Sequence, residues 1–220
     1  MNKDYSIRKA TINDVNFLTD VIIGAEKSMT DNLGLAKFFD VTEEHLRSLI
    51  ISMFEEEVDG CEFSISSFFV ACYKNKPVAA LSGWLEAYYD NMQSSLLKSN
   101  LINTTFPKES IIKGVSNFEI IKDIQFERKK NAYQFEYSYV DSKHRGRYLI
   151  NKLIDAHLDF AKKLSSDVKK AQLQPFENNL NIIKTVELSG FHFVKRFESK
   201  NKEILNYFPY NVKLLMEKII

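Results

Sequence analysis

Apolar residues in the first part of the chain recur first at helical and then at strand-like spacing. After Thr11 they lie three or four positions apart at Val15, Leu18 and Ile22, which places them on one face of a helix. The run FFVACY at residues 68–73 is apolar and rich in aromatic side chains, as buried strands are. The elements predicted from these patterns are an extended segment at residues 5–9, helices beginning at Thr11 and Thr42, and a hairpin with strands 68–73 and 78–85 around a turn at 74–77.

Strand-like and helix-like segments alternate in the last part of the chain. Strands are predicted at residues 133–140, 170–174, 191–198 and 212–218, and helices at about 148–164 and 179–189. Such alternation implies that part of the central sheet is parallel, whereas the hairpin adds antiparallel strands. The predicted fold class is therefore α/β.

Residues 88–131 separate these two parts and show no strand alternation. They contain helix-compatible pieces at 93–101 and 115–126, on either side of Pro107. With 220 residues, the chain suits one domain with an insertion or at most two small domains. We predict a single domain over residues 1–220, with 88–131 as a helical insertion between the third and fourth strands.

Composition and charge narrow the classes of partner. Thirty basic and 29 acidic residues leave a net charge of +1, which does not favour nucleic acid or an anionic membrane as the main partner. Cys61 and Cys72 form neither a disulfide framework nor a zinc-like spacing, so we expect two reduced thiols and no metal. The N-terminal segment lacks the apolar stretch of a signal peptide, and no apolar segment is long enough to span a bilayer. We expect a cytoplasmic protein.

The segment from Val140 to Ile150 carries the clearest candidate chemistry. A predicted strand runs through a short basic turn into a predicted helix, whose first N–H groups and dipole favour an anion. Arg145 and Arg147 add positive charge, and Gly146 tolerates backbone conformations that other residues resist. These features predict that the turn binds a phosphate-bearing ligand.

Together these pieces resemble the GNAT superfamily of acyl-CoA N-acyltransferases. The GNAT signature is a strand ending in Val-Asp followed by Q/R-x-x-G-x-G/A, and here Val140-Asp141 precedes Arg145-Gly146-Arg147-Tyr148-Leu149-Ile150. The opening SIRKATINDVNFL, Asn179, the pair Gly190-Phe191 and the closing VKLLMEKII also match the pattern. The resemblance covers most of the chain outside residues 88–131. It implies a mixed, largely antiparallel central sheet with a parallel central strand pair, flanked by helices.

The resemblance implies acetyl-CoA or another acyl-CoA as cofactor. Its pyrophosphate is expected on backbone N–H groups of residues 145–150, and its pantetheine beside the end of strand 133–140. The cofactor-binding residues implied are Tyr139, Val140, Arg145, Gly146, Arg147, Tyr148, Leu149, Ile150 and Asn179.

Three positions depart from the GNAT pattern. Tyr148 replaces the first motif glycine, and Ile150 replaces the terminal glycine or alanine. Val186 stands where many members carry a tyrosine proposed to protonate the departing thiolate. If the Tyr148 ring cannot turn away from the diphosphate, we expect a cost of about 1–2 kcal/mol in binding.

Glu136 and Tyr137 are the catalytic candidates. A carboxylate within the central strand is costly unless it is partnered or functional, and burial raises a carboxyl pKa toward the range of a general base. The alternative is that Glu136 lies near the exposed end of the strand and contacts a lysine or water. Tyr137 and Tyr139 are candidate proton donors in place of Val186, although packing roles are common for buried tyrosines. The segment with Trp84, Glu86 and Tyr88 is expected on the acceptor-substrate side.

The leading hypothesis is an N-acetyltransferase that acts on a small-molecule or protein amine. Direct transfer in a ternary complex is expected, because no Cys or Ser nucleophile with an adjacent base is evident. One alternative is a catalytically degenerate GNAT domain that binds acyl-CoA or a protein partner without turnover. Another is a module that binds a different phosphate at the arginine-rich turn. A homodimer is left open, as is a role for residues 88–131 in forming it.

Overall fold

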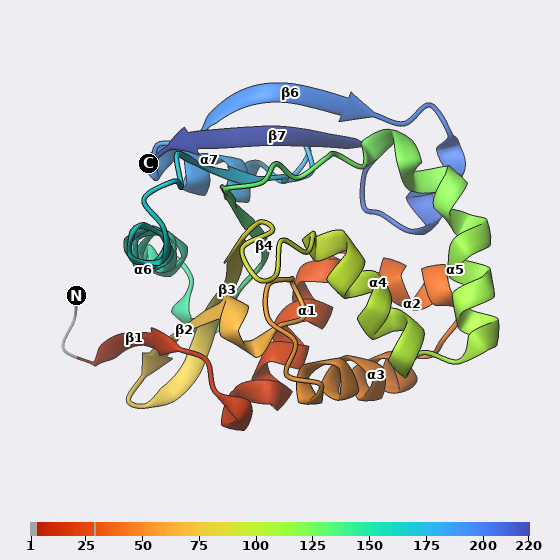
Figure 1. Ribbon diagram of the computed structural model, residues 1–220, viewed down its shortest axis with the longest axis horizontal. Helices are drawn as coiled ribbons and strands as arrows, with labels where there is room; N and C mark the ends of the chain where they lie inside the picture. The colour runs from red at the N-terminus through yellow and green to blue at the C-terminus, as the bar shows by residue number, and fades with distance from the viewer. Residues whose placement is uncertain (1–3, 29) are drawn as a thin grey trace.

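The computed structural model describes residues 4–28 and 30–220, and these residues form a seven-stranded sheet (Figure 1). The strands are β1 (Tyr5–Lys9), β2 (Phe68–Tyr73), β3 (Lys76–Leu85), β4 (Ala132–Val140), β5 (Lys170–Leu173), β6 (His192–Glu198) and β7 (Val212–Ile219). Their order in the sheet is β1-β2-β3-β4-β5-β7-β6. Only β4 and β5 pair in parallel among these neighbours. The expected mixed sheet with one central parallel pair is confirmed.

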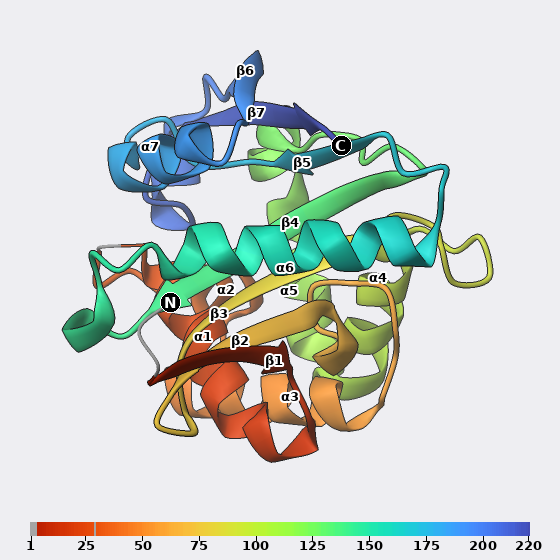
Figure 2. The ribbon, with the colours of Figure 1, turned by 90° about the vertical axis from the view of Figure 1, so that its left-hand side faces the viewer.

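Helices cover both faces of the sheet, and each face has its own apolar core. The helices are α1 (Val15–Lys27), α2 (Gly34–Phe39), α3 (Glu43–Glu55), α4 (Ser94–Thr105), α5 (Lys108–Ile121), α6 (Leu149–Leu164) and α7 (Leu180–Leu188). Figure 2 shows α6 lying across one face, with α1 and α3 on the opposite side. The described residues include no helix that is both long and apolar enough to cross a membrane.

Local sequence explains several element boundaries. The side chain of Thr42 accepts a hydrogen bond from His45 N at 3.1 Å and caps α3. Lys74 and Asn75 both adopt positive φ angles, which suits the two-residue turn of a hairpin. The second hairpin strand therefore begins at Lys76, two residues earlier than predicted. The first helix is preceded by a short 3-10 turn at Ile12–Asp14.

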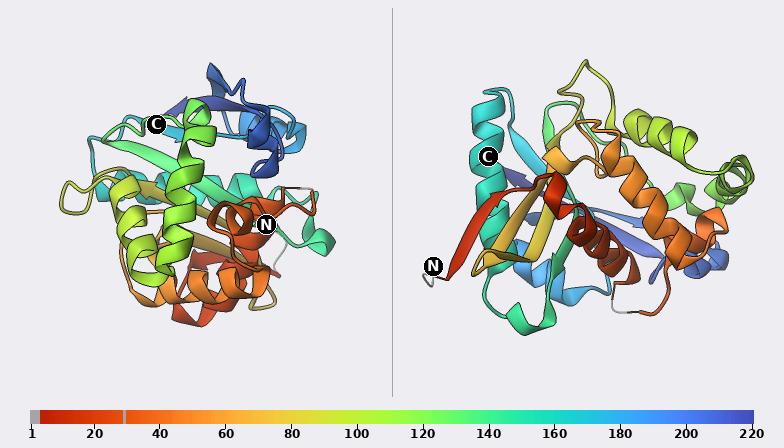
Figure 3. Two further views of the ribbon diagram at one scale, coloured as in Figure 1. Left: turned by 90° about the vertical axis from the view of Figure 1, so that its right-hand side faces the viewer. Right: turned by 90° about the horizontal axis from the view of Figure 1, so that it is seen from below.

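Residues 88–131 contain helices, as the sequence predicts, but with different bounds. α5 begins directly after Pro107, because proline is tolerated at the start of a helix, and it ends at Ile121 before a 3-10 turn (Lys122–Ile124). α4 and α5 pack on α3 and α2, respectively (Figure 3). The short helix α2 was not predicted from the sequence. The helices α4 and α5 therefore extend the helical layer on the α1 side of the sheet.

Candidate active site

The parallel strands β4 and β5 separate soon after they begin. Their pairing covers only residues 132–134 and 170–172, where the side chain of Gln134 donates to that of Gln172 at 2.9 Å. Beyond this point β4 stays paired with β3 as far as Val140. The β5 side of β4 is therefore left without a strand partner, which opens a cleft at the centre of the sheet.

A β-bulge in β4 lies beside this opening. Leu81 pairs with Ser138 and Gly83 pairs with Phe135, so Ser82 faces two residues, Glu136 and Tyr137. The N–H of Tyr137 donates to the hydroxyl of Ser82 at 3.0 Å. The bulge therefore turns the Tyr137 N–H toward β3 and away from the cleft.

Backbone direction after the bulge identifies the groups that face the cleft. The N–H of Tyr137 and that of Asp141, which donates to Val78 O at 2.8 Å, both point toward β3. Because backbone groups alternate in direction along a strand, those of Ser138 and Val140 point into the cleft, and those of Tyr139 point toward β3. The backbone of Val140, one of the implied cofactor-binding residues, therefore faces the cleft. At Tyr139 the side chain is what reaches the cleft, and its ring packs against Gly24 of α1.

The basic turn between β4 and α6 has an open backbone. Gly146 has a φ of +73°, and no heavy atom lies within 4 Å of the position that a Cβ would occupy. The first helical hydrogen bond runs from Lys152 N to Tyr148 O. The N–H groups of residues 149–151 therefore have no acceptor inside the helix, which is the property required for binding an anion.

Both arginines of the turn have contacts within the chain. Arg145 Nε donates to Val140 O at 3.3 Å, and the guanidinium of Arg147 lies 5.9 Å from the ring centre of Tyr5. Each side chain also lines the cleft. Both positive charges therefore lie at the edge of the cleft.

The three departures from the GNAT signature have different surroundings. Tyr148 occupies the left-handed region at φ +57°, which favours glycine, and 67% of its surface is exposed. Ile150 and the buried Val186 line the inner wall of the cleft. An exposed ring has room to turn outward, whereas the two aliphatic side chains only narrow the cleft.

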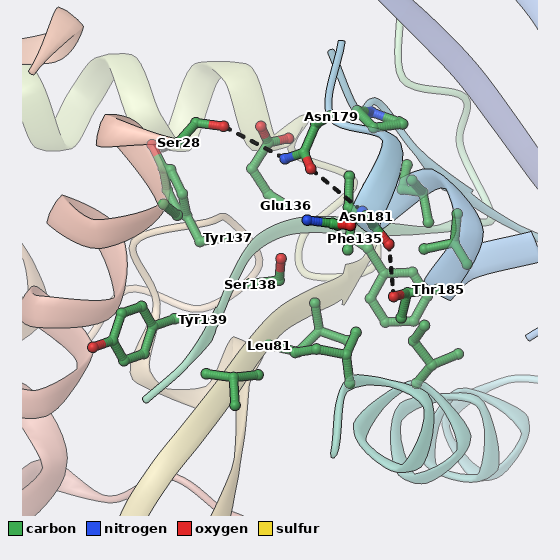
Figure 4. A pocket seen from close by; sticks show the side chains of 18 of the residues that line it. Ser28, Leu81, Phe135, Glu136, Tyr137, Ser138, Tyr139, Asn179, Asn181 and Thr185 are labelled. Carbon is green, nitrogen blue, oxygen red and sulfur yellow. Dashed lines mark hydrogen bonds between the residues drawn. The ribbon is translucent and has the colours of Figure 1, made fainter. Parts of the chain in front are cut away.

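Asn179 joins the two sides of the cleft. Its Oδ1 accepts from Ile182 N at 3.3 Å and caps α7. Its Nδ2 lies 3.5 Å from the Ser28 hydroxyl at the end of α1. Figure 4 shows this contact near the side chains of the bulged strand. The cleft, hereafter the strand cleft, has a volume of about 660 Å³.

A second cavity, of about 810 Å³, is lined in part by residues of the segment 88–131. We call it the helix cavity, because α2, α4 and α5 supply most of its wall. Six residues line both the strand cleft and the helix cavity, and they mark the junction where the two spaces meet. They are Glu26, Glu136, Tyr137, Gln174, Phe208 and Lys213.

Glu136 is held by an arginine at this junction. Arg128 Nη2, from the segment 88–131, lies 3.1 Å from its carboxylate. Arg128 also pairs with Glu62 at 3.3 Å, and Lys98 pairs with Glu62 at 2.9 Å. Burial alone raises the pKa of Glu62, but Arg128 and Lys98 outweigh burial and lower it to about 2. All four residues of this network line the helix cavity.

Glu26 is a second junction carboxylate, and its contacts differ from those of Glu136. It accepts a hydrogen bond from the Tyr137 hydroxyl at 3.1 Å, and no cation lies within ion-pair distance of it among the described residues. Burial raises the pKa of Glu26, although the hydrogen bond from Tyr137 partly opposes this shift. Burial and the adjacent Glu26 raise the pKa of Tyr137 well above its usual value. Near neutral pH, Tyr137 is therefore a protonated donor next to a carboxyl of raised pKa.

The three residues expected on the acceptor-substrate side, Trp84, Glu86 and Tyr88, have different positions relative to the cavities. Glu86 lines the helix cavity, where it accepts from Trp84 Nε1 at 2.9 Å and from Ser94 N and Oγ at 2.8 and 2.7 Å. Trp84 lies behind it, with the Arg128 guanidinium 4.8 Å from its ring. Tyr88 lines neither cavity, and its hydroxyl lies near Leu164 O. Glu86 and Trp84 thus support the cavity, and Tyr88 lies away from it.

Three residues of the site were not predicted from the sequence. Glu26 lies four residues after Ile22 and eight after Leu18, so it continues the buried stripe of α1, and an acidic residue in that stripe was a usable signal. Arg128 and Lys213 carried no comparable signal, because each reaches the junction only through the tertiary fold.

Solved structures provide an independent comparison of the fold. The sequence matches no protein-family profile, and no curated protein is similar to it in sequence. An N-acetyltransferase from Staphylococcus aureus Mu50 superposes with a TM-score of 0.66 and 16% identity, over 98% of this chain and 100% of that chain. A GNAT-family acetyltransferase from Streptococcus pneumoniae superposes with a TM-score of 0.53 and 13% identity, over 98% and 99%.

The chain has the GNAT acetyltransferase fold. The aminoglycoside acetyltransferase AAC(6')-Ib in complex with coenzyme A also superposes, with a TM-score of 0.53 and 11% identity, over 98% of this chain and 94% of that chain. These superpositions extend over nearly the whole chain. In this GNAT fold the strand cleft lies between the separated central strands.

Proposed function

We propose that the protein is an acyl-CoA-dependent N-acyltransferase that transfers an acetyl group from acetyl-CoA to an amine. The observation that carries this proposal is the meeting of two cavities at one point beside β4. A cofactor in the strand cleft and an acceptor in the helix cavity can touch only at their shared residues. Direct transfer in a ternary complex needs this arrangement.

The strand cleft suits an acyl-CoA along its whole length. The open turn at Gly146 and the free N–H groups of residues 149–151 fit a pyrophosphate. The cleft-facing backbone of Ser138 and Val140 fits the amide groups of a pantetheine. The neighbour AAC(6')-Ib was solved with coenzyme A, which supports the same ligand class here.

Glu26 and Tyr137 are suited to move the proton during transfer. A bound acyl-CoA supplies a thioester, whose carbon–sulfur bond breaks as the amine nitrogen forms a bond to the carbonyl carbon. An ammonium acceptor first releases one proton to solvent. Glu26 then takes the proton that the attacking nitrogen loses, and Tyr137 passes a proton to the sulfur. The hydrogen bond from Tyr137 to Glu26 returns that proton to Tyr137, so the balance closes at amide plus thiol.

Titration calorimetry tests the cofactor. Acetyl-CoA and CoA are expected to bind in the micromolar range, and Arg145→Ala is expected to weaken both by roughly tenfold, as loss of a charged phosphate contact does. Arg47→Ala, which changes an exposed arginine of α3, is the matched control. ATP distinguishes a general phosphate site: equal affinity for ATP and CoA contradicts the proposal.

A pair of variants tests the chemistry. Glu26→Gln is expected to lower kcat roughly a hundredfold or more and to remove the acidic limb of its pH profile. Glu136→Gln is expected to have a smaller effect on kcat, because Glu136 is engaged by Arg128. If Glu136→Gln abolishes turnover and Glu26→Gln does not, the roles are reversed and Glu136 is the base.

A catalytically degenerate GNAT domain is the second candidate. It is favoured by Val186, which offers no proton, and by Tyr148 and Ile150 in place of small motif residues. This candidate predicts CoA binding with no thiol release for any amine. Detection of free thiol in the presence of an amine panel excludes it.

A further inference from the structure

The outer part of the helix cavity is apolar. Its wall includes Leu35 and Phe38 of α2, Ile102 of α4, Ile111 of α5 and Phe126. Val115 and Phe118 form part of the rim, with 71% and 52% of their surfaces exposed. Exposed apolar side chains at the rim of a cavity are typical of binding sites. The outer part therefore suits an apolar group.

The charges at the inner end of this cavity are mostly compensated. Glu62 pairs with Lys98 and Arg128, and Glu136 pairs with Arg128. Glu86 accepts hydrogen bonds from neutral donors. Within residues 4–28 and 30–220, Glu26 and Lys213 are the two charged junction residues with no opposite charge within 4.0 Å.

Lys213 presents its ammonium at the junction between two aromatic rings. Its Nζ lies 5.1 Å from the ring centres of both Phe176 and Phe208. Burial lowers the pKa of Lys213, although Glu136 and Glu26 partly oppose the shift. A desolvated ammonium without an ion partner gains more from a bound anion than an exposed lysine does.

We propose that the acceptor is an α-amino acid with an apolar side chain. Its amine lies at Glu26, its carboxylate pairs with Lys213, and its side chain fills the apolar part of the helix cavity. A zwitterion with adjacent charges matches this arrangement, because the carboxylate of Glu26 and the ammonium of Lys213 line the same junction. A polyamine leaves Lys213 unpaired, and a peptide N-terminus offers it no adjacent carboxylate. This inference rests on the proposed acyltransferase function.

The first test compares phenylalanine with phenethylamine, which lacks the carboxylate. Titrations are made into protein saturated with CoA, so binding is read without turnover. Phenylalanine is expected to bind roughly tenfold more tightly than phenethylamine, and Lys213→Gln is expected to remove that advantage. Lys195→Gln, which changes an exposed lysine of the edge strand β6, is the matched control.

The second test uses kinetics with the same two amines. Lys213→Gln is expected to raise the KM for phenylalanine roughly tenfold and to leave the KM for phenethylamine unchanged. Equal slowing of both amines overturns the inference, since Lys213 then acts on the acyl group or the thiolate. Equal binding of both amines to wild-type protein also overturns it.

Failure of the acyltransferase proposal has a different signature. In that case CoA does not bind, or it binds and no thiol is released with any amine. If CoA binds without thiol release, the phenylalanine titration still tests whether the junction binds an apolar amino acid. Alanine and aspartate serve as probes of the side-chain pocket, and tighter binding of either than of phenylalanine contradicts an apolar acceptor.

Discussion

The strand cleft and the helix cavity meet at one junction, but they are built in different ways. The part of the strand cleft proposed to hold the phosphates and the pantetheine consists largely of backbone groups of β4 and of the turn between β4 and α6, which are neighbours in the sequence. The helix cavity consists of side chains from α2, α4, α5 and the loops before β4 and β7, which are far apart in the sequence. A backbone-based site tolerates side-chain changes, such as Tyr148 for glycine, whereas the helix cavity depends on each residue that forms it.

Gly34→Ala is expected to produce the largest effect among single substitutions in the helix cavity. A Cβ at this position lies 1.5 Å from the carbonyl oxygen of Tyr207, so backbone must move. We expect a loss of more than about 3 kcal/mol in the free energy of unfolding, at the upper end for overpacking.

Gly146→Ala is the matched change in the strand cleft. Its Cβ meets nothing within 4 Å, and only the positive φ opposes it, so a loss of about 1 kcal/mol is expected. Chemical denaturation measures both variants. Similar losses for the two contradict the proposed difference between the cavities.

Glu62→Gln comes next in expected size. The change leaves Arg128 and Lys98 buried near a neutral group, and loss of one partner from a buried charge network costs about 3 kcal/mol. Glu43→Gln removes an exposed ion pair with Lys27 and is expected to cost less than about 1 kcal/mol. Urea denaturation at pH 7 compares the two, and equal losses contradict the buried network.

The lowered pKa of Glu62 predicts that the stability of the protein depends on pH. Its folded pKa of about 2 lies below the ordinary value of 4.5, so its stabilisation of about 3 kcal/mol is complete above pH 4.5 and is lost as the pH falls toward 2. Subtracting the stability curve of Glu62→Gln from that of the wild type isolates this contribution. A difference that does not change between pH 5 and pH 2 contradicts the lowered pKa.

Tyr148→Gly is expected to have the smallest effect on folding. Glycine relieves the left-handed conformation, which favours stability by at most about 1 kcal/mol, and the exposed ring loses little packing. Tyr148→Ala keeps the backbone strain and removes the ring, so it separates the two effects. Tighter CoA binding in both variants identifies the ring as an obstacle, and tighter binding in Tyr148→Gly alone identifies the backbone.

The fold was predictable to the extent that its signals are local. Helical spacing identifies α1 and α3, and the strand–turn–helix order from β4 to α6 implies the parallel pair. The bounds of the hairpin were predicted less accurately. The turn at Lys74 and Asn75 is shorter than the four-residue turn predicted, because both residues adopt left-handed conformations. The helix α2 was missed because six residues give too short a stretch for the helical period to be recognised.

In the candidate site, too, the local features were predictable from the sequence and the long-range contacts were not. The turn at 145–150 and the helix that follows Asn179 lie where the sequence places them, since each depends on residues adjacent in the chain. The roles of Glu136 and Glu26 could not be compared from the sequence. Arg128 reaches Glu136 from the segment that precedes β4, and Tyr137 of β4 reaches Glu26 of α1.

The sequence by itself determined the order of elements, the basic turn and the mixed character of the sheet, because periodicity, caps and turns act over a few residues. Only the tertiary structure decided which charges are compensated and which are left at the junction. Glu26, Tyr137 and Lys213 lie on α1, β4 and β7, and burial and ion pairing depend on distances that arise only when these elements pack together.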